Sequence, residues 1–407
     1  MSPEIRAITP DEALVYRRAV RAGFGYPDTV DDDEFARAMS DTCERALVTF
    51  DRGAIVATLQ SFPTELTVPG GATVAAGGLT AVTCRATHRR QGLLTRMMEI
   101  DLAGSRDRGE LVEILIAAEY PIYGRFGYGP AVYSTRWELD ATVLTFANRG
   151  AGTIEYVDNA TYRKEAPAIF ERVRAQRPGM IERSDFNWDV YADLRRRPED
   201  KPWVGFRLLV RDDDGVAQGW ANYVHKEQWT DMRPHSTAEV RDLCAATPAA
   251  EARLWRFLAE FDHVATVTAG DRSADELLPW LLIDARAARQ MALSDFVWVR
   301  PLDVPGLLSA RAYVASGRVV LEIVDAQGLA GGRFALDASP DGATCVATDE
   351  SAEITLPVRT LGAVSLGGVR LAPLHAAGWA DEHAPGAIHR ADALFAGSVV
   401  PWCNTWF

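Results

Sequence analysis

Hydrophobic and polar positions along the first third of the chain follow a pattern typical of an α/β unit. Residues 9–25 carry apolar side chains at helical spacing behind Thr9 or Asp11, two residue types that commonly cap helices. Residues 45–84 then alternate strand-like runs with turn signals at 51–53 and 69–71. The pattern predicts a helix followed by several antiparallel strands.

The next stretch predicts the rest of this first region. Leucines and methionines recur every three or four residues over 90–109, which indicates an amphipathic helix with one buried face. A short apolar strand is expected over 111–120 and a loop or helix rich in glycine and tyrosine over 121–131. A further strand over 131–140 is assigned to the same region.

A similar order of elements returns later in the chain, with a helix, a hairpin around Asp214 and Gly215, a strand and a second helix. The tetrapeptides at 84–87 and 244–247 share the pattern C-x-A-T, and each lies where a strand is expected to meet a helix. We infer an internal duplication. In the second copy, proline and alanines replace the cations and the glycine that follow the first motif, so we expect it to keep the shape and to lose the site.

The last part of the chain alternates short strands with helical stretches and carries no catalytic motif of its own. The fold class expected for the whole chain is α/β (α+β), with two similar units and a small C-terminal α+β domain. The predicted domains are residues 1–155, 156–299 and 300–407.

The composition narrows the classes of protein. The chain has 407 residues, 48% hydrophobic and 24% charged, and a net charge of −13, which disfavours nucleic acid as the main partner. No apolar run is long enough to span a bilayer, and the N-terminus lacks the features of a secretory signal. Five scattered cysteines without C-x-x-C spacing suggest neither a disulfide framework nor a zinc site. We expect a cytoplasmic protein without a metal.

A cluster of cations lies where the amphipathic helix is expected to begin. His88, Arg89 and Arg90 are followed by Gly92. A helix N-terminus presents unpaired N–H groups and a partial positive charge, glycine lets a ligand approach the backbone, and arginine suits phosphate oxygens. The combination predicts a pyrophosphate site beside a strand edge. The alternative is a solvated, basic helix start with a tolerated glycine.

The segment VTCRATHRRQGLLTRMM, residues 82–98, resembles the acetyl-CoA-binding segment of the GNAT-superfamily N-acetyltransferases. Arg89, Gly92 and Leu94 take the three defined places of the motif Q/R-x-x-G-x-G/A, with a leucine where the family has a small residue. THRRQGLL, and IYGRFGYGPA at 122–131, narrow the resemblance to the Eis (enhanced intracellular survival) acetyltransferases. The resemblance covers the whole chain and implies two GNAT-like units, the second degenerate, and a sterol-carrier-protein-like C-terminal domain.

This resemblance implies that acetyl-CoA is the cosubstrate. Backbone groups at the end of the expected strand would hold the pantetheine arm, the helix start would wrap the pyrophosphate, and the end of the next strand would complete the slot. The residues expected to bind acetyl-CoA are Val82, Thr83, Cys84, Arg89, Arg90, Gln91, Gly92, Leu93, Leu94, Thr95, Ala118 and Glu119.

The resemblance also implies two catalytic groups, the Tyr123 hydroxyl as general acid and the α-carboxylate of Phe407 as base. Proton transfer from a phenol with a pKa of about 10 to a thiolate is only slightly unfavourable in free energy. An ordinary α-carboxyl has a pKa of about 3.5, so such a base would act by electrostatic attraction, through water or with a pKa raised by burial. Without the resemblance, an ordinary turn with packed aromatics and a hydrophobic C-terminal plug explain both segments, and Tyr120, Tyr128 and Tyr133 compete with Tyr123.

The acceptor pocket is expected to involve Phe24, Tyr26, Asp28 and Trp406, which make it more aromatic and less acidic than the pockets of the best-known members of the resembled family. We therefore expect weaker or narrower acetylation of aminoglycosides. The acidic run at 31–34 is interpreted as a solvated helix start.

The function expected is acetyl-CoA-dependent N-acetyl transfer to an amine, either an aminoglycoside-like or other small molecule or a protein lysine. The alternative is a carrier of hydrophobic ligands built on a non-catalytic scaffold. A tRNA-dependent aminoacyl transferase is disfavoured by the net charge of −13. The resemblance implies a homo-oligomer, a hexamer, and no membrane or nucleic-acid partner.

Overall fold

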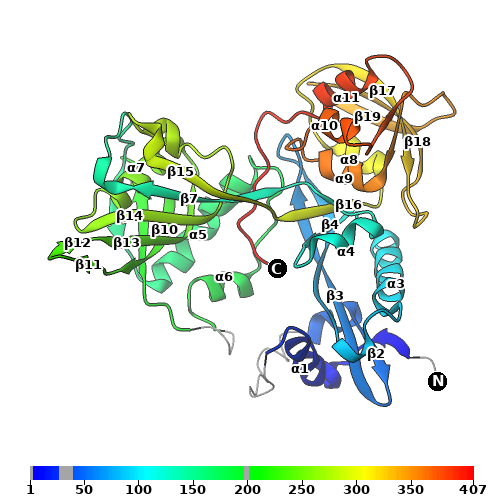
Figure 1. The fold of residues 1–407 in the computed structure, drawn as a ribbon, viewed down its shortest axis with the longest axis horizontal. Coiled ribbons are helices and arrows are strands. Elements are labelled where there is room, and N and C mark those ends of the chain that lie inside the picture. Colours follow the sequence, from blue (N-terminus) through cyan, green and yellow to red (C-terminus); the bar gives the residue numbers. More distant parts are fainter. Residues whose placement is uncertain (1–2, 27–39, 197–200) are drawn as a thin grey trace. The chain divides into compact units, whose positions relative to one another are not determined.

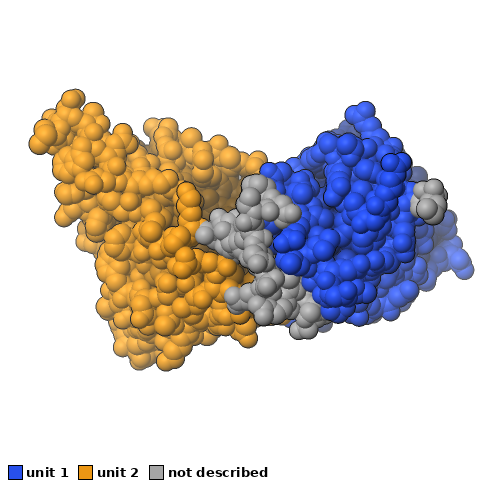
Figure 2. All heavy atoms as spheres, turned by 90° about the horizontal axis from the view of Figure 1, so that it is seen from below, with its two compact units in different colours: residues 1–131, 297–398, 406–407 blue, residues 132–296, 399–405 orange. Residues whose placement is uncertain are grey.

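The computed structural model describes residues 3–26, 40–196 and 201–407. The chain divides into two compact units, which Figure 2 shows in different colours. Unit 1 contains residues 1–131, 297–398 and 406–407, and unit 2 contains residues 132–296 and 399–405.

A mixed sheet forms the first part of unit 1, with the strand order β1-β2-β3-β4-β5-β16-β6. β1 to β4 pair antiparallel in sequence, which confirms the expected antiparallel strands. β5 is parallel to β4, and β16 is antiparallel to β5 and β6. The strands are β1 (Glu4–Ala7), β2 (Ala46–Asp51), β3 (Ala54–Thr67), β4 (Thr73–Cys84), β5 (Val112–Ile116), β6 (Gly129–Pro130) and β16 (Val297–Pro301).

Helices cover both faces of this sheet (Figure 1). Neighbouring residues of a strand point to opposite faces, and the neighbours Leu47 and Val48 belong to different hydrophobic clusters. The cluster around Val48 includes Tyr16 of α1, and the cluster around Leu47 includes Met97 of α3. The helices are α1 (Ala13–Gly23), α3 (Leu93–Asp107) and α4 (Tyr120–Tyr123), with 3-10 turns at Pro10–Glu12, Ser40–Arg45, Ala86–His88 and Gly124–Phe126. The two long helices were predicted.

The parallel strands β4 and β5 separate toward their carboxyl ends. Their pairing runs from Ala76 with Val112 to Leu79 with Leu115, although β4 continues to Cys84. The register of β4 against β3 shifts in the same stretch, where Ala81 has a φ of 53°. This irregularity is a β-bulge, which bends the strand. The last residues of β4 are therefore paired with β3 on one side only.

The last strand assigned to the first region lies elsewhere. β7 (Tyr133–Asp140) pairs with β14 and β15 in the sheet of unit 2, whereas β16, from after unit 2, pairs with β5 and β6 in unit 1. The expected strand over 131–140 thus exists, but its assignment to the first sheet was wrong. As a result, the chain passes from one unit to the other at 131/132, 296/297, 398/399 and 405/406, whereas the predicted domain limits are 155/156 and 299/300.

A separate sheet and short helices form the C-terminal part of unit 1. The strand order is β19-β18-β17-β20-β21. This part meets the first sheet through α9, where a Cβ on Gly362 would lie 2.2 Å from the Val299 carbonyl oxygen and one on Gly129 would lie 1.9 Å from that of Arg359. The elements are α8 (Val304–Ala310), β17 (Gly317–Val324), β18 (Gly332–Ser339), β19 (Gly342–Ala347), β20 (Ile354–Pro357), α9 (Val358–Val364), α10 (Leu371–Ala376), β21 (Asp381–Glu382) and α11 (Ala387–Phe395).

Unit 2 contains a second mixed sheet, with the order β15-β7-β14-β13-β10-β9-β8, and a small hairpin of β11 and β12. β13 and β14 are parallel and neighbouring, as β4 and β5 are in unit 1. This repetition is consistent with the inferred duplication. The elements are β8 (Thr153–Tyr156), α5 (Asn159–Arg174), α6 (Asp185–Tyr191), β9 (Phe206–Arg211), β10 (Ala217–Lys226), β11 (Trp229–Thr230), β12 (Arg233–Pro234), β13 (Ser236–Ala245), α7 (Pro248–Ala259), β14 (Val264–Arg272) and β15 (Ala288–Asp295), with 3-10 turns at Ala141–Val143, Leu278–Leu281 and Ala285–Ala287.

Among the residues that the structure describes, no helix combines the length and the apolar character that crossing a membrane requires. Each of the five cysteines is a free thiol.

Candidate active site

The junction between β4 and α3 leaves a helix N-terminus open. Gly92 is the N-cap of α3, with a φ of 75°, and its position lacks a side-chain cap. The first turn closes with the bond from the Arg96 N–H to the Gly92 carbonyl, at 3.2 Å. The N–H groups of Leu93, Leu94 and Thr95 precede that bond and have no acceptor within the described part of the chain. They form a site for an anion.

The space around Gly92 suits a large anionic group. A Cβ built on Gly92 would meet no atom within 4 Å. Arg89 and Arg90 are exposed, and in the described residues neither of them forms an ion pair. Arg90 has a φ of 63°, which is costly for a residue with a side chain. Two unpaired cations, open backbone and helix N–H groups together fit a diphosphate.

His88 does not share this role. Its Nε2 lies 3.2 Å from the Asp51 carboxylate on β2, and its Nδ1 lies 2.8 Å from the Thr87 hydroxyl. His88 is adjacent to the two arginines in the sequence, but in the structure its ring contacts the Asp51 carboxylate. The cations available to a ligand at this junction are therefore Arg89 and Arg90.

The split between β4 and β5 begins beside this junction. The side chains of Val82, Cys84 and Leu94 pack against the cluster that contains Leu93 and Tyr123. The Thr83 hydroxyl lies 2.7 Å from the Thr58 hydroxyl on β3. On the other side of the split, Ala118 and Glu119 follow β5 and are exposed. The structure thus brings the predicted residues of both strands and of the helix start to one end of one core.

Tyr123 lies in this core at the end of α4. Its side chain is 7% exposed, and its ring centroid is 6.1 Å from that of Tyr128. Burial and the negative charge of Glu119 raise the pKa of Tyr123 to about 12. The phenol therefore stays protonated at any physiological pH, but it is a weaker acid than the sequence suggested.

The other tyrosines occupy different environments. Tyr120 is exposed and packs edge-on against Trp298 at 4.7 Å. The Tyr128 hydroxyl is buried and donates to the Glu113 carboxyl group. Tyr133 belongs to β7 in unit 2. Among these residues, Tyr123 alone combines a buried ring with a position beside the split.

The loop after Tyr123 is anchored by the C-terminal part of unit 1. Arg300 on β16 is fully buried, its Nε donates to the Phe126 carbonyl at 2.7 Å, and its Nη2 pairs with Asp325 at 2.8 Å. A buried ion pair of this kind fixes geometry more than it adds stability. The sequence did not indicate this pair, because an arginine in one strand and an aspartate just after another carry no local signal of their contact.

Two buried carboxyl groups lie next to this site. Asp101 on α3 accepts from the Ser61 hydroxyl at 2.7 Å, and its Oδ2 is buried without a conventional donor. Glu113 on β5 accepts from Ser105 and Tyr128. Burial and then the charge of Asp101 raise the pKa of Glu113 well above its usual range. A proton on Glu113 supplies the donor that Asp101 lacks.

This pair predicts a pH-dependent stability. The folded state holds a proton that the unfolded chain releases above about pH 4.5, so the free energy of unfolding falls as the pH rises above that value. Glu113→Gln places an amide N–H donor at the same position, and this donor does not depend on binding a proton from solution. We expect its unfolding free energy to fall less steeply between pH 5 and 8, by up to about 1.4 kcal/mol per pH unit for one proton. Urea denaturation across this range measures the difference, and parallel curves for the two proteins would contradict the shared proton.

The C-terminal tail is buried in unit 2 until its last two residues. Arg183 donates to the Thr405 hydroxyl at 3.0 Å and to the Asn404 carbonyl at 2.9 Å. The Trp402 indole N–H donates to the Asp271 carbonyl at 2.8 Å. Residues 401–405 are all buried, which confirms that this uncharged tail is packed and not frayed.

Phe407 lies in unit 1. Its ring centroid is 5.6 Å from that of Phe62 on β3, in an edge-to-face arrangement. Phe62 pairs with Gly78 on β4, where a Cβ would come within 2.3 Å of the Phe62 ring. Trp406 is 54% exposed. Phe62 was not among the predicted site residues, although two consecutive glycines in a strand, Gly77 and Gly78, indicate a close neighbour.

The predicted acceptor residues follow α1. A Cβ on Gly23 would come within 2.3 Å of the Thr83 hydroxyl oxygen, so the end of α1 packs on the end of β4. Phe24 and Tyr26 are about half exposed, and the Arg21 guanidinium lies 5.6 Å from the centre of the Tyr26 ring. Asp28 and the acidic run at 31–34 lie outside the described residues.

The corresponding junction in unit 2 is closed. The Thr247 hydroxyl accepts from the Ala250 N–H at 3.2 Å, and Pro248 has no N–H, so this helix start offers fewer donors. Arg272 on β14 donates to the Leu243 carbonyl on β13 and pairs with Glu276 at 2.7 Å. The guanidinium thus links the two parallel strands where unit 1 has an open split. Unit 2 has kept the shape and lost the anion site, as expected.

The described residues contain no cluster of three or more His, Cys, Asp or Glu that could hold a metal.

Models of known families match most of the chain. Residues 4–131 match the model described as "Acetyltransferase (GNAT) domain", and residues 179–301 match a second model with the same description. Residues 304–404 match "Sterol carrier protein domain".

Curated proteins and solved structures agree with these matches. An uncharacterized N-acetyltransferase of Streptomyces griseus is 42% identical over 416 residues and covers 100% of both chains. The N-acetyltransferase Eis of Mycobacterium tuberculosis is 35% identical over 345 residues, which are 82% of this chain and 81% of that protein. The crystal structure of Eis1 from Mycobacterium abscessus superposes with a TM-score of 0.87 at 29% identity and covers 99% of this chain and 100% of that one. A GCN5-related N-acetyltransferase from Anabaena variabilis, at 19% identity and a TM-score of 0.82, shares the fold over the full length of both chains.

Proposed function

The chain belongs to the Eis-type N-acetyltransferases of the GNAT superfamily, and from this premise we propose that it transfers the acetyl group of acetyl-CoA to a primary amine, with Tyr123 and the Phe407 carboxylate as its catalytic groups. An acyl-CoA is the cosubstrate of this family. The single observation that carries the proposal is the open N-terminus of α3, where Gly92, two unpaired arginines and helix N–H groups fit a diphosphate. A scaffold that had lost its activity would not need this site, and unit 2 shows how such a site closes.

The cosubstrate would lie across the split between β4 and β5. Its diphosphate would take the N–H groups of residues 90–95 and the charges of Arg89 and Arg90. Its pantetheine arm would add hydrogen bonds along the free edge of β4 at residues 82–84, in the way a further strand would. Ala118 and Glu119 would close the opposite side.

Acyl transfer then needs two proton movements. The amine nitrogen bonds to the carbonyl carbon of the thioester and the C–S bond breaks, so the nitrogen must lose a proton and the sulfur must gain one. Tyr123 would give its phenolic proton to the departing thiolate. The Phe407 carboxylate would attract the ammonium form of the acceptor and take up its first proton, directly or through water, before the nitrogen attacks. The second proton, which the nitrogen loses after the attack, would replace the one that Tyr123 gave to the sulfur.

The raised pKa of Tyr123 sets a requirement for this step. A thiol in water has a pKa of about 8.5, so proton transfer from a phenol of pKa about 12 would be uphill by about 5 kcal/mol. Burial disfavours a charged thiolate in the same core and so raises the pKa of the thiol. This reduces the difference between the pKa values of the phenol and the thiol. Transfer concerted with C–S cleavage is therefore the form of general acid catalysis that we propose.

The acceptor site that we propose is aromatic. Phe24, Tyr26, Trp406 and Phe407 would supply ring faces, which attract cations without a full negative charge. We propose that amines with an apolar body are used better than aminoglycosides with many charges. Asp28 and assembly into a hexamer stay predictions of the resemblance.

The carrier alternative stays a prediction, and the match of residues 304–404 to "Sterol carrier protein domain" is the observation that favours it. The interior of the C-terminal sheet is filled by buried side chains, among them Leu321, Leu336, Leu356 and Leu361.

The proposal is tested by coenzyme A binding in a matched pair of glycine variants. Gly92 and Gly109 have φ values of 75° and 78°, and a Cβ at either position meets no atom within 4 Å. Both alanine substitutions therefore carry a similar backbone strain, of about 1 kcal/mol. Because only Gly92 faces the proposed diphosphate, we expect Gly92→Ala to weaken coenzyme A binding about tenfold or more, and Gly109→Ala to leave it unchanged.

Calorimetry measures the affinities, and release of free thiol from acetyl-CoA in the presence of an amine panel measures turnover. Absence of binding to the parent protein, or equal affinities for the two variants, would refute the diphosphate site. Binding without thiol release for any amine would leave the site but refute the acetyl transfer.

A further inference from the structure

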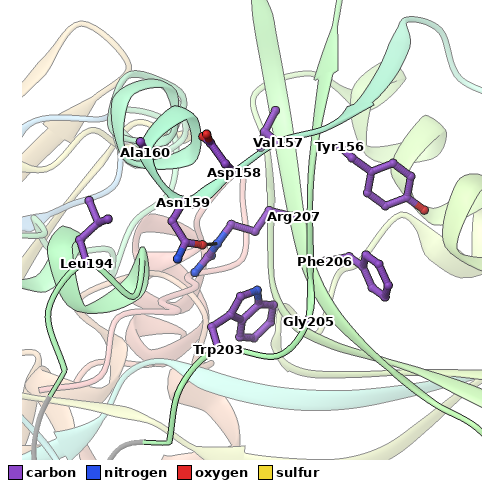
Figure 3. A pocket seen from close by; sticks show the side chains of 10 residues that line it. All are labelled: Tyr156, Val157, Asp158, Asn159, Ala160, Leu194, Trp203, Gly205, Phe206 and Arg207. Carbon is purple, nitrogen blue, oxygen red and sulfur yellow. Dashed lines mark hydrogen bonds between the residues drawn. The ribbon is translucent and has the colours of Figure 1, made fainter.

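A pocket of about 710 Å³ opens in unit 2, where the start of α5 meets the start of β9. Its walls come from residues 156–160 and 205–207, together with Leu194 and Trp203. None of them belongs to the candidate active site. Figure 3 shows the side chain of Arg207 in the middle of the pocket, between Asn159 and the indole of Trp203.

Arg207 is buried but keeps part of its hydrogen-bonding edge free. It is 3% exposed, its Nε donates to the Asn159 Oδ1 at 2.8 Å, and its Nη2 donates to the Tyr191 carbonyl at 3.0 Å. The guanidinium lies 4.5 Å from the ring centre of Tyr162 and 4.9 Å from that of Trp203. A guanidinium has five N–H donors. Within the described residues the Arg207 group has these two hydrogen bonds, so donors at Nη1 remain for a ligand.

The charge of Arg207 also lacks a direct counterion. In the part of the chain that the structure describes, no carboxylate lies within ion-pair distance of it. The two nearby carboxylates are engaged elsewhere, since Asp193 pairs with Arg196 at 3.3 Å and Asp242 pairs with Arg183 at 3.3 Å. Buried arginines are normally paired. An anionic ligand would provide the missing partner.

Two further features of the pocket indicate what the anion carries. The indole Nε1 of Trp203 is buried and has no acceptor among the residues that the structure describes, which is costly for a donor and would be relieved by a ligand oxygen. Tyr156 and Phe206 are about half exposed and lie edge-to-face at 5.7 Å. Exposed aromatic rings beside a cation favour a flat, apolar ligand body.

One acidic group limits the charge of the ligand. Asp158 lines the pocket, and its carboxylate accepts the Thr161 N–H at 2.7 Å as the cap of α5. The site therefore offers one unpaired cation against one carboxylate that is already hydrogen-bonded. A ligand with a single negative charge fits this balance better than a phosphate dianion.

We propose that this pocket binds a small aromatic monocarboxylate. The carboxylate oxygens accept from Arg207 and from the Trp203 indole, and the ring packs against Trp203 and Phe206. This binding is independent of acetyl transfer, because the pocket shares no residue with the proposed active site.

The test uses the full chain and isothermal titration with benzoate and indole-3-acetate as probes. Benzamide removes the charge and acetate removes the ring, so we expect both to bind at least about tenfold more weakly than benzoate. Asn159→Asp puts a carboxylate on Arg207 with little change of shape, and an acid is favourable in the first turn of a helix. We expect it to weaken binding of benzoate about ten- to a hundredfold.

Val204→Asp is the matched control, because Val204 is 81% exposed and does not line the pocket, so the added charge stays outside it. We expect unchanged binding. Trp203→Phe keeps a ring and removes the indole donor, and a threefold or greater loss of affinity is expected. The proposal is overturned if benzoate does not bind the parent protein at millimolar concentration, if Asn159→Asp binds it equally well, or if acetate or inorganic phosphate binds as tightly as benzoate.

Discussion

Tyr123→Phe is expected to lower kcat by about a hundredfold to ten thousandfold, the range typical of losing a general acid. The variant keeps the buried ring and its edge-on contact with Tyr128, so the core around it should not change. The site proposed for the diphosphate, at the start of α3, does not involve the phenol. The affinity for coenzyme A should therefore stay within about twofold of the parent value, and stopped assays of thiol release together with calorimetry separate the two effects.

Tyr120→Phe is the matched control. It removes the same hydroxyl from the same short helix, but this ring is exposed and packs on Trp298. We expect parent kcat. Because burial raises the pKa of Tyr123 to about 12, ionisation of Tyr123 should cause no loss of rate up to pH 10. The pH–rate profile should instead rise with pH as the amine loses its proton. If Tyr123→Phe keeps the parent kcat, Tyr123 has no part in the mechanism.

Much of unit 1 could be predicted because its signals are local. The amphipathic stripe of α3 and the alternation over β2 to β4 depend on residues a few positions apart, and the structure confirms them. The open helix start was predicted for the same reason, since Arg89, Arg90 and Gly92 are adjacent in sequence and their roles follow from backbone chemistry.

Pairings between distant segments could not be predicted in this way. β7 has the same alternating pattern whichever sheet receives it, so its sequence does not show that β16 takes the place beside β5. The bulge at Ala81, which separates β4 from β5, lies in a run of ordinary strand residues. The contact of His88 with Asp51 could not be predicted either, because Asp51 lies on β2, far away in the sequence.

The same contrast between local signals and distant contacts applies to the residues of the site. The Arg300–Asp325 pair and the Asp101–Glu113 pair each join segments whose contact only the tertiary structure reveals. Burial of the C-terminal tail, in contrast, could be predicted from the sequence, because an uncharged end with two tryptophans is expected to be packed. Residues 404 and 405 of this tail are anchored within unit 2 by Arg183.

Extending the chain beyond Phe407 by a short Gly-Ser segment is expected to lower kcat at least about a hundredfold. The extension converts the α-carboxylate of Phe407 into a neutral amide and moves the terminal charge away from the amine. The Phe407 ring keeps its contact with Phe62, and the residues at the start of α3 are unchanged. The affinity for coenzyme A should therefore be that of the parent, which calorimetry measures beside the rate of thiol release.

Phe407→Ala distinguishes the charge from the ring. It keeps a carboxylate at the end of the chain and removes the packing against Phe62, so we expect an intermediate loss, mainly as a higher KM for the amine because the terminus is held less firmly. The same Gly-Ser segment at the N-terminus controls for the added length. An extended protein with the parent kcat would show that the carboxylate is not the base, and proton removal from the amine would then need another group near Tyr123.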